Sequence, residues 1–167
     1  MKTLNRTPIL YVRNFIFGAE DSLVSTVGLL TGVATAGITG KEIVISGVIL
    51  ICVEAFSMSV GSFLSERATE ESFLNYNKQK SKSFLAAIIM FISYFVCGFI
   101  PLLPYMLTTT DQAFWLSIVF SSISLFILGL VSAKILKTRI LKNALRMLII
   151  GGSAIAIGVI VGIILKS

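Results

Sequence analysis

Long apolar runs separated by short polar stretches make up most of the chain. Each of five runs has roughly 20 or more residues, enough for a helix rising about 1.5 Å per residue to cross a hydrocarbon core about 30 Å thick. The most polar stretch, residues 66–83, follows the second run. The pattern predicts an all-α membrane protein with five transmembrane helices in a single transmembrane domain, residues 1–167. The expected spans are residues 15–38, 43–65, 84–107, 113–133 and 144–165.

Local signals refine the ends of these spans. Residues 39–42, TGKE, predict a tight turn, and Pro101 and Pro104 are expected to break or kink the third helix near its exit. Good helix formers at the start of residues 66–83 indicate that the second helix continues past the membrane surface. The connector KILKTRILKNALR, residues 134–146, is expected to be partly helical and to lie at that surface.

Composition excludes a soluble globular domain. The chain has 167 residues, of which 56% are hydrophobic, and its mean hydropathy is +0.95. The net charge of +6 could suggest nucleic acid as a partner, but the basic residues cluster between apolar runs, which favours membrane topology. The first residues lack a small-residue cleavage site, so we expect no cleaved signal peptide.

Loop charges predict the orientation. Three Lys or Arg lie in the N-terminal arm, four in residues 66–83 and five in residues 134–146, against only Lys41 and Lys166 elsewhere. By the positive-inside rule the N-terminus and the loop 66–83 are cytosolic. Tyr105 and Trp115 would form an aromatic belt on the far side. The expected location is multi-pass in the plasma (inner) membrane of a prokaryote or a vacuolar-type membrane of a eukaryote.

The first span carries adjacent carboxylates, Glu20 and Asp21. A charged residue at membrane depth costs roughly 2.5–3.5 kcal/mol on insertion scales, so it indicates a functional site. Asp21 shares a helical face with Gly28 and Gly32, whose GxxxG spacing allows close helix approach. Alternatively, Asp21 snorkels and the glycines only pack. We interpret Asp21 as a metal ligand and Glu20, about 100° away, as a second-tier candidate.

The second span places Glu54 deep in the membrane, with Met58 one turn later on the same face. An unpaired carboxylate there is expected to be protonated, and a metal ion would displace the proton, which is the basic requirement of an antiporter. Met sulfur is a soft ligand that disfavours Mg²⁺ and Ca²⁺. Alternatively, Glu54 is neutral and hydrogen-bonds between helices, and Met58 only packs. Both are predicted metal ligands.

Three carboxylates follow the second span: Glu66, Glu70 and Glu71. They could gather cations at a cytosolic entrance or form a solvated helix face, so they are second-tier candidates. The chain has no histidine, and Cys52 and Cys97 show no paired motif. Metal chemistry must therefore use carboxylates, Met sulfur, hydroxyls and backbone carbonyls.

One protomer offers few ligands for a divalent ion. A homodimer with the pathway near its two-fold axis would duplicate Asp21, Glu54 and Met58. The small-residue helix faces support the same inference.

Five stretches together resemble the vacuolar iron transporter family, in the right order over nearly the whole chain. They are EDSLVSTVGLLTGVATA, EAFSMSVGSFLSERATEE, GFIPLLPYML, AFWLSIVF and ALRMLIIGGSAIAIGVIVG. The resemblance implies a five-span homodimer that exports Fe²⁺, and often Mn²⁺ or other divalent ions, from the cytosol in exchange for protons. It also implies that Asp21 handles metal and protons and that Met58 is a pathway ligand.

The chain departs from the family pattern in three places. Ser62 stands where many members carry Glu, and Glu54 stands where a small residue is expected. The long Glu-rich cytosolic insertion is reduced to the loop 66–83, so the chain is similar to shorter, insertion-lacking relatives. The role of Glu54 therefore rests on the physical argument.

The sequence predicts a proton-coupled Fe²⁺ or Mn²⁺ exporter without a resident cofactor. Its expected partners are divalent metal ions, protons, membrane lipid and a second copy, and no nucleic acid. The alternatives are a non-transporting membrane scaffold or partner subunit, and a transporter of the same fold for a different cation. An enzyme is not expected, because the sequence contains no nucleophile with a base, no nucleotide-binding loop and no Cys/His zinc pattern.

Overall fold

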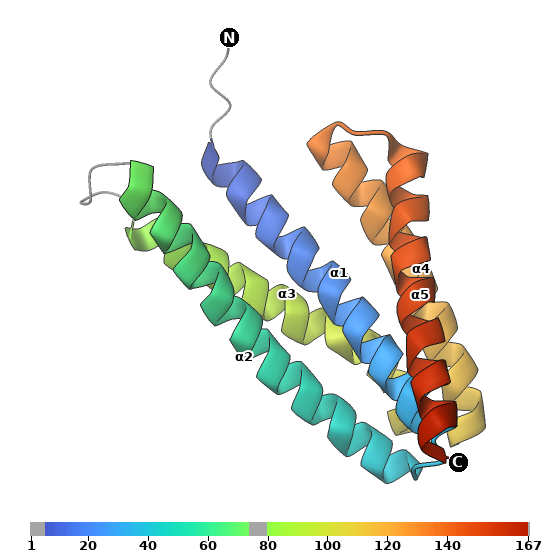
Figure 1. Ribbon diagram of the computed structural model, residues 1–167. Helices are drawn as coiled ribbons and strands as arrows, with labels where there is room; N and C mark the ends of the chain where they lie inside the picture. Colours follow the sequence, from blue (N-terminus) through green and yellow to red (C-terminus); the bar gives the residue numbers. More distant parts are fainter. Residues whose placement is uncertain (1–5, 74–79, 167) are drawn as a thin grey trace.

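Five long helices make up the described part of the chain (Figure 1). The computed structural model describes residues 6–73 and 80–166, and the side chains of residues 8–69 and 82–166. All five helices are long and apolar enough to cross a membrane, which confirms the predicted all-α membrane class. The helices are α1 (Arg6–Thr35), α2 (Gly40–Phe73), α3 (Lys80–Leu107), α4 (Thr110–Leu136) and α5 (Ile140–Lys166).

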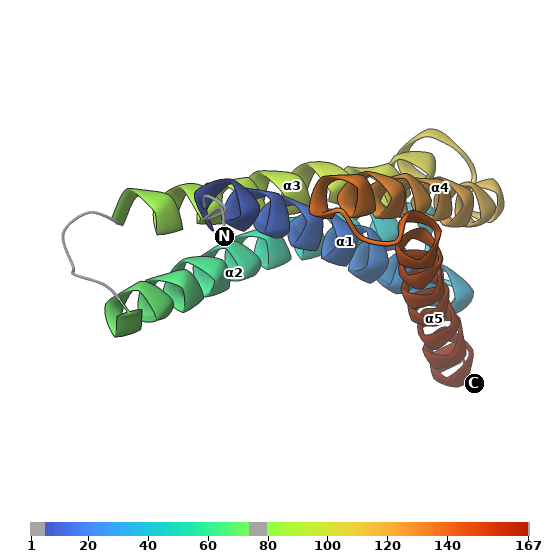
Figure 2. The same cartoon turned by 90° about the horizontal axis from the view of Figure 1, so that it is seen from above.

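Helix α1 lies at the centre of the arrangement. It packs mainly against α3 and α5, while α2 packs mainly against α3 and α4 against α5. In Figure 1, α2 lies to the left of α1 and α5 to its right, while α3 crosses behind α1. Figure 2 shows the same arrangement from above, with α3 and α2 on opposite sides of α1. Helices α1 and α2 make fewer direct contacts with each other than either makes with α3. Space for a polar site therefore remains between α1 and α2.

Successive helices run in opposite directions, so the predicted cytosolic segments gather at one end. The start of α1, the end of α2 and the α4–α5 turn lie at the same end in Figure 1, whereas the α1–α2 turn and the end of α5 lie at the other. We call the first the basic end, because it carries Arg13, Lys134, Lys137, Arg139 and Lys142.

The α1–α2 turn lies earlier than predicted. Helix α1 ends at Thr35 because Gly37 adopts a left-handed backbone with φ of 85°, which favours glycine. Residues 40–42, predicted as part of the turn, instead begin α2, and Thr39 directly precedes the helix. There the Thr39 amide and hydroxyl donate to the Glu42 carboxylate over 3.2 and 2.8 Å, as in a capping box.

Of the two outcomes expected at the prolines of α3, a break or a kink, the break is not found. The helix continues through Pro101 and Pro104 to Leu107. The Ser117 hydroxyl of α4 donates to the Pro101 carbonyl over 2.7 Å, and the Thr108 amide and hydroxyl donate to the Pro104 carbonyl over 2.9 Å. Each proline removes only its own N–H donor, so one carbonyl four residues earlier loses its helical partner, while the carbonyls of Pro101 and Pro104 themselves keep donors.

The predicted surface connector 134–146 is mostly the continuation of two long helices. Helix α4 runs to Leu136 and α5 starts at Ile140, so a tight turn joins them. Lys137 adopts a left-handed conformation that ends α4. Helix α2 continues to Phe73, as the helix formers after residue 65 predicted.

Tyr105 does not fit the predicted aromatic belt, because it is buried. Trp115 is 68% exposed, but Tyr105 is 6% exposed and packs in a core cluster with Leu30 and Leu102. Because α3 continues past both prolines, Tyr105 remains inside the bundle and does not reach an interface.

The glycine face of α1 packs against α5 of the same chain. A Cβ on Gly28 would lie 3.2 Å from the Ala154 carbonyl oxygen, and one on Gly32 would lie 2.8 Å from that of Gly158. The close approach predicted from the GxxxG spacing is therefore found. Because α5 occupies this face, it gives no support to the predicted dimer, which then rests on ligand count.

Candidate functional site

A cavity of about 680 Å³ lies between α1 and α2 toward the basic end. It brings Met58 and Glu66, two of the predicted ligands, together with polar side chains of α1 and the thioether of Met90 on α3. Gly61 widens it, because no atom lies within 4 Å of a Cβ built there. The lining residues are Arg13, Asn14, Phe17, Ser57, Met58, Gly61, Ser62, Ser65, Glu66 and Met90.

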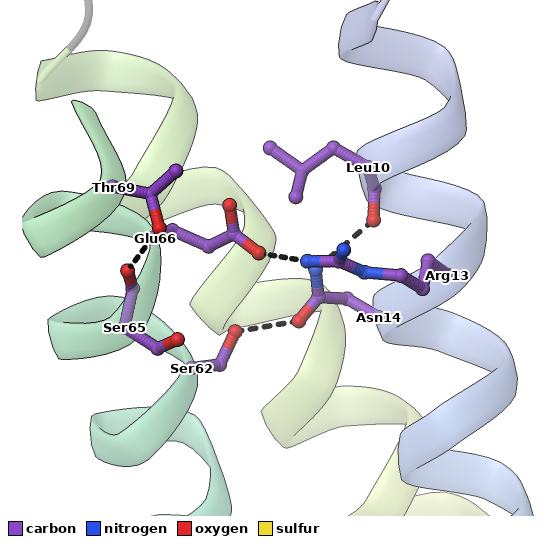
Figure 3. Close-up of polar contacts among 7 residues, drawn as sticks. All are labelled: Leu10, Arg13, Asn14, Ser62, Ser65, Glu66 and Thr69. Carbon is purple, nitrogen blue, oxygen red and sulfur yellow. Dashed lines mark hydrogen bonds and ion pairs between the residues drawn. The ribbon is translucent and has the colours of Figure 1, made fainter. Parts of the chain in front are cut away.

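Two polar contacts join α1 to α2 at this cavity (Figure 3). Arg13 forms an ion pair with Glu66, and the Ser62 hydroxyl donates to the Asn14 side-chain oxygen over 2.5 Å. The Asn14 amide in turn donates to the Leu10 carbonyl over 3.0 Å. Glu66, predicted as a possible cation collector, is therefore neutralised by a cation of its own chain in this structure.

Sequence reasoning did not predict Asn14 or Met90 as lining residues, and it noted Ser62 only as a departure from the family pattern. Asn14 and Met90 are each 3% exposed. A Cβ on Gly18 would lie 3.0 Å from the Met90 sulfur, so the glycine leaves room for this thioether. Asn14 lies two helical turns before Asp21, so the face that Asp21 occupies could have pointed to it.

The carboxylates of Asp21 and Glu54, on α1 and α2, are close enough to interact electrostatically. The fully buried Tyr94 of α3 interacts electrostatically with both. Its hydroxyl lies 2.7 Å from the Ser25 hydroxyl, and the Ser22 hydroxyl donates to its carbonyl over 2.6 Å. Two acids and a phenol from three helices thus share one electrostatic environment.

The two predicted halves of the site lie one helical turn apart along α2. Met58 lines the cavity toward the basic end, whereas neither Asp21 nor Glu54 is among the lining residues. The structure therefore places the sulfur and the acids in succession along one direction, from the basic end inward. Such a series of ligands is suited to an ion that passes from one set of atoms to the next.

Glu20 is directed to another part of the protein. Its carboxylate interacts electrostatically with Arg146 of α5 more strongly than with Asp21. This placement agrees with the sequence expectation that the two neighbouring acids point in different directions. Glu20 therefore lies on the α5 side of α1, while Asp21 lies on the α2 side.

The described acids of one copy do not form a complete metal site. Among the side chains of residues 8–69 and 82–166, no three Cys, Asp or Glu come close enough to hold a metal ion. The backbones of Glu70 and Glu71 belong to α2, but their side chains lie outside the described residues. The described ligands of one protomer are thus few, and further ligands would have to come from hydroxyls, thioethers, water or a second copy.

The arrangement brings carboxylate, hydroxyl and thioether groups, which suit cations and protons, into an apolar bundle. A family model described as the VIT family matches residues 12–84 and 71–163, which together include Asp21, Glu54 and Met58. No curated protein matches the chain. The family match confirms the resemblance predicted from the five sequence stretches, and the five apolar helices indicate a multi-pass integral membrane protein. The chain therefore belongs to the VIT family, which implies that it transports metal ions across a membrane.

Proposed function

We propose that this protein is a proton-coupled exporter of divalent metal, with Fe²⁺ or Mn²⁺ as substrate, that works as a homodimer. The observation that carries the proposal is that two acids, Asp21 and Glu54, lie within two different membrane-spanning helices, α1 and α2. Acids in apolar spans are expensive to insert and typically mark ion or proton pathways. Membership of a metal-transporting family supports the same reading.

The same two carboxylates link metal to protons. In this proposal the pair holds a proton when no metal is bound, because like charges in an apolar environment repel. A divalent cation supplies the compensating charge directly and so releases protons as it binds. When the metal leaves, protons return to the carboxylates. This exchange at one site couples the two ions without a second binding step.

Methionine sulfur provides selectivity in this proposal. Met58 and Met90 both line the cavity that leads from the basic end toward Glu54. Thioethers are soft ligands that favour iron-like or softer ions over Mg²⁺ and Ca²⁺. Two of them along the approach therefore disfavour the hard divalent ions that are abundant in cells.

Orientation and dimerisation complete the proposal. The positive-inside rule puts the basic end in the cytosol, so the cavity opens to the compartment from which metal is exported. Helix α2 presents an apolar face, with Val53 and Phe56 exposed by 59% and 65%, beside the face of Glu54 and Met58. A second copy on this face would place two sets of ligands around one axis.

The test is metal flux into proteoliposomes with an imposed pH gradient. Wild-type protein should carry Fe²⁺ or Mn²⁺ in the direction that the proton gradient drives. Asp21→Asn and Glu54→Gln should each lose at least about tenfold in rate, a barrier change of roughly 1.4 kcal/mol. Asp111→Asn is the matched control, because it removes an exposed acid in the first turn of α4 and should behave as wild type.

Other outcomes distinguish the alternatives. Full activity of both neutral variants would mean that the acids serve helix packing, as in a scaffold. Flux of a different cation that Fe²⁺ and Mn²⁺ do not compete with would indicate a transporter of the same fold with another substrate. Flux independent of the pH gradient would exclude proton exchange.

A further inference from the structure

A groove of about 960 Å³ lies on α5 at the basic end, away from the cavity between α1 and α2. Three cations line it: Arg139, Lys142 and Arg146. The other lining residues are aliphatic and include Leu145 and Ile149, which are 47% and 71% exposed. The groove therefore combines positive charge with an open apolar wall.

The charge in this region is balanced only in part by nearby acids. After Gln112 the sequence contains six Lys or Arg and no Asp or Glu. Arg146 interacts with Glu20 of α1, but within the described residues no ion pair involves Arg139 or Lys142. Both side chains are exposed and remain available to an anion.

The cations and the aliphatic side chains follow one another along the helix. Arg139 and Lys142 lie at the start of α5, and Leu145 and Ile149 continue one and two turns further in. Lys142 and Arg146 are one turn apart and share a face. The first amides of α5 also lie at the charged end, where a helix favours negative charge.

We propose that this groove binds an anionic phospholipid, with its phosphate at Arg139 and Lys142 and an acyl chain along Leu145 and Ile149. Basic residues at a membrane surface attract anionic headgroups, and the aliphatic wall matches an acyl chain. A second copy meeting the groove symmetrically would bring a second set of cations, and like charges would repel. A free phosphate would leave the aliphatic wall unused.

The test is native mass spectrometry of the delipidated full chain, titrated with phosphatidylglycerol or with phosphatidylcholine of the same acyl chains. Wild type should bind phosphatidylglycerol at least about tenfold more tightly. The double variant R139Q/K142Q should weaken that binding by about thirtyfold, on the scale expected for two cations at an anionic surface. Arg146 stays unchanged, because it interacts with Glu20 beside the candidate site.

The matched control is K134Q/K137Q. It removes the same charge from exposed cations of the same turn that do not line the groove. This variant should keep the wild-type preference, and equal weakening by both double variants would overturn the proposal in favour of diffuse charge. Glycerol phosphate should not compete at lipid concentrations, and competition as effective as that of phosphatidylglycerol would overturn the assignment to a lipid. Circular dichroism checks that each variant is folded.

Discussion

Ser62 on α2 and Asn14 on α1 form a 2.5 Å hydrogen bond beside the ion pair between Arg13 and Glu66 (Figure 3). These contacts matter because α1 and α2 otherwise touch little. Asn14 is buried, so its side-chain oxygen has little access to water. The hydrogen bond therefore fixes the spacing of the two helices that carry the candidate acids.

Ser62→Ala should destabilise the protein by about 1 kcal/mol, since it leaves the buried Asn14 oxygen without its donor. Thermal unfolding in detergent measures the loss. Ser153→Ala is the control, because the exposed Ser153 hydroxyl bonds only to the Ile150 carbonyl of its own helix. Equal losses of stability in both variants would show that the hydrogen bond between α1 and α2 stabilises the protein no more than the Ser153 hydroxyl does.

Gly158→Ala should destabilise the protein by about 1–3 kcal/mol or prevent folding. A Cβ at Gly158 would collide with the Gly28 carbonyl oxygen, which belongs to the backbone of α1 and cannot rotate away. Gly152→Ala is the matched control on the same helix, because no atom lies within 4 Å of its Cβ. It should be neutral or stabilising by up to about 1 kcal/mol, as alanine favours a helix over glycine.

The two buried tyrosines of α3 should respond in opposite ways to loss of their hydroxyls. The Tyr94 hydroxyl bonds Ser25 over 2.7 Å, whereas the buried Tyr105 hydroxyl has no described partner. Tyr94→Phe should cost about 1 kcal/mol, and Tyr105→Phe should be neutral or stabilising, because it removes an unsatisfied polar group. Chemical unfolding of both variants compares them directly. Similar losses would mean that Tyr105 has a partner such as water.

The sequence predicted the helices well because membrane thickness imposes a length of about 20 apolar residues on each one. It misplaced the first turn, because hydropathy does not register the left-handed Gly37 or the cap formed by Thr39 and Glu42. The break considered at Pro101 and Pro104 is not found, because each proline removes only one backbone hydrogen bond from a long helix.

The site was predictable only in part. The helical period alone predicted that Gly28, Gly32 and Asp21 share one face of the helix. It did not predict that α5 of the same chain would cover the two glycines. The pairing of Asn14 with Ser62 depends on how α1 meets α2, which no local pattern encodes. An Asn or Ser in an apolar span costs little free energy to insert, so its presence does not indicate one particular role. Glu54 costs much more to insert, so its presence indicates a functional site.

Met58→Leu should weaken selectivity more than stability. The swap nearly conserves volume, so it should cost less than about 1.5 kcal/mol in stability. It removes a soft ligand, and inhibition of Fe²⁺ or Mn²⁺ flux by Mg²⁺ should strengthen by about tenfold, equivalent to roughly 1.4 kcal/mol. Met106→Leu, at an exposed position near the opposite end of α3, is the control. Unchanged competition in Met58→Leu would assign the sulfur to packing.

Ser57→Cys should form a disulfide between two copies if α2 lies at the two-fold axis. Ser57 is exposed, and it lines the same cavity as Met58, so a symmetric partner would bring the two Ser57 positions near each other. A disulfide requires Cα atoms within about 7 Å, which makes the result specific to the axis.

The free cysteines Cys52 and Cys97 are first replaced by alanine. After mild oxidation in membranes, a dimer band should appear with Ser57→Cys and be absent with the control Ile127→Cys, which places a thiol on the exposed face of α4. A dimer band with Ile127→Cys alone would move the interface to α4, and Met58 and Glu54 would then lie too far from their copies to share one metal ion.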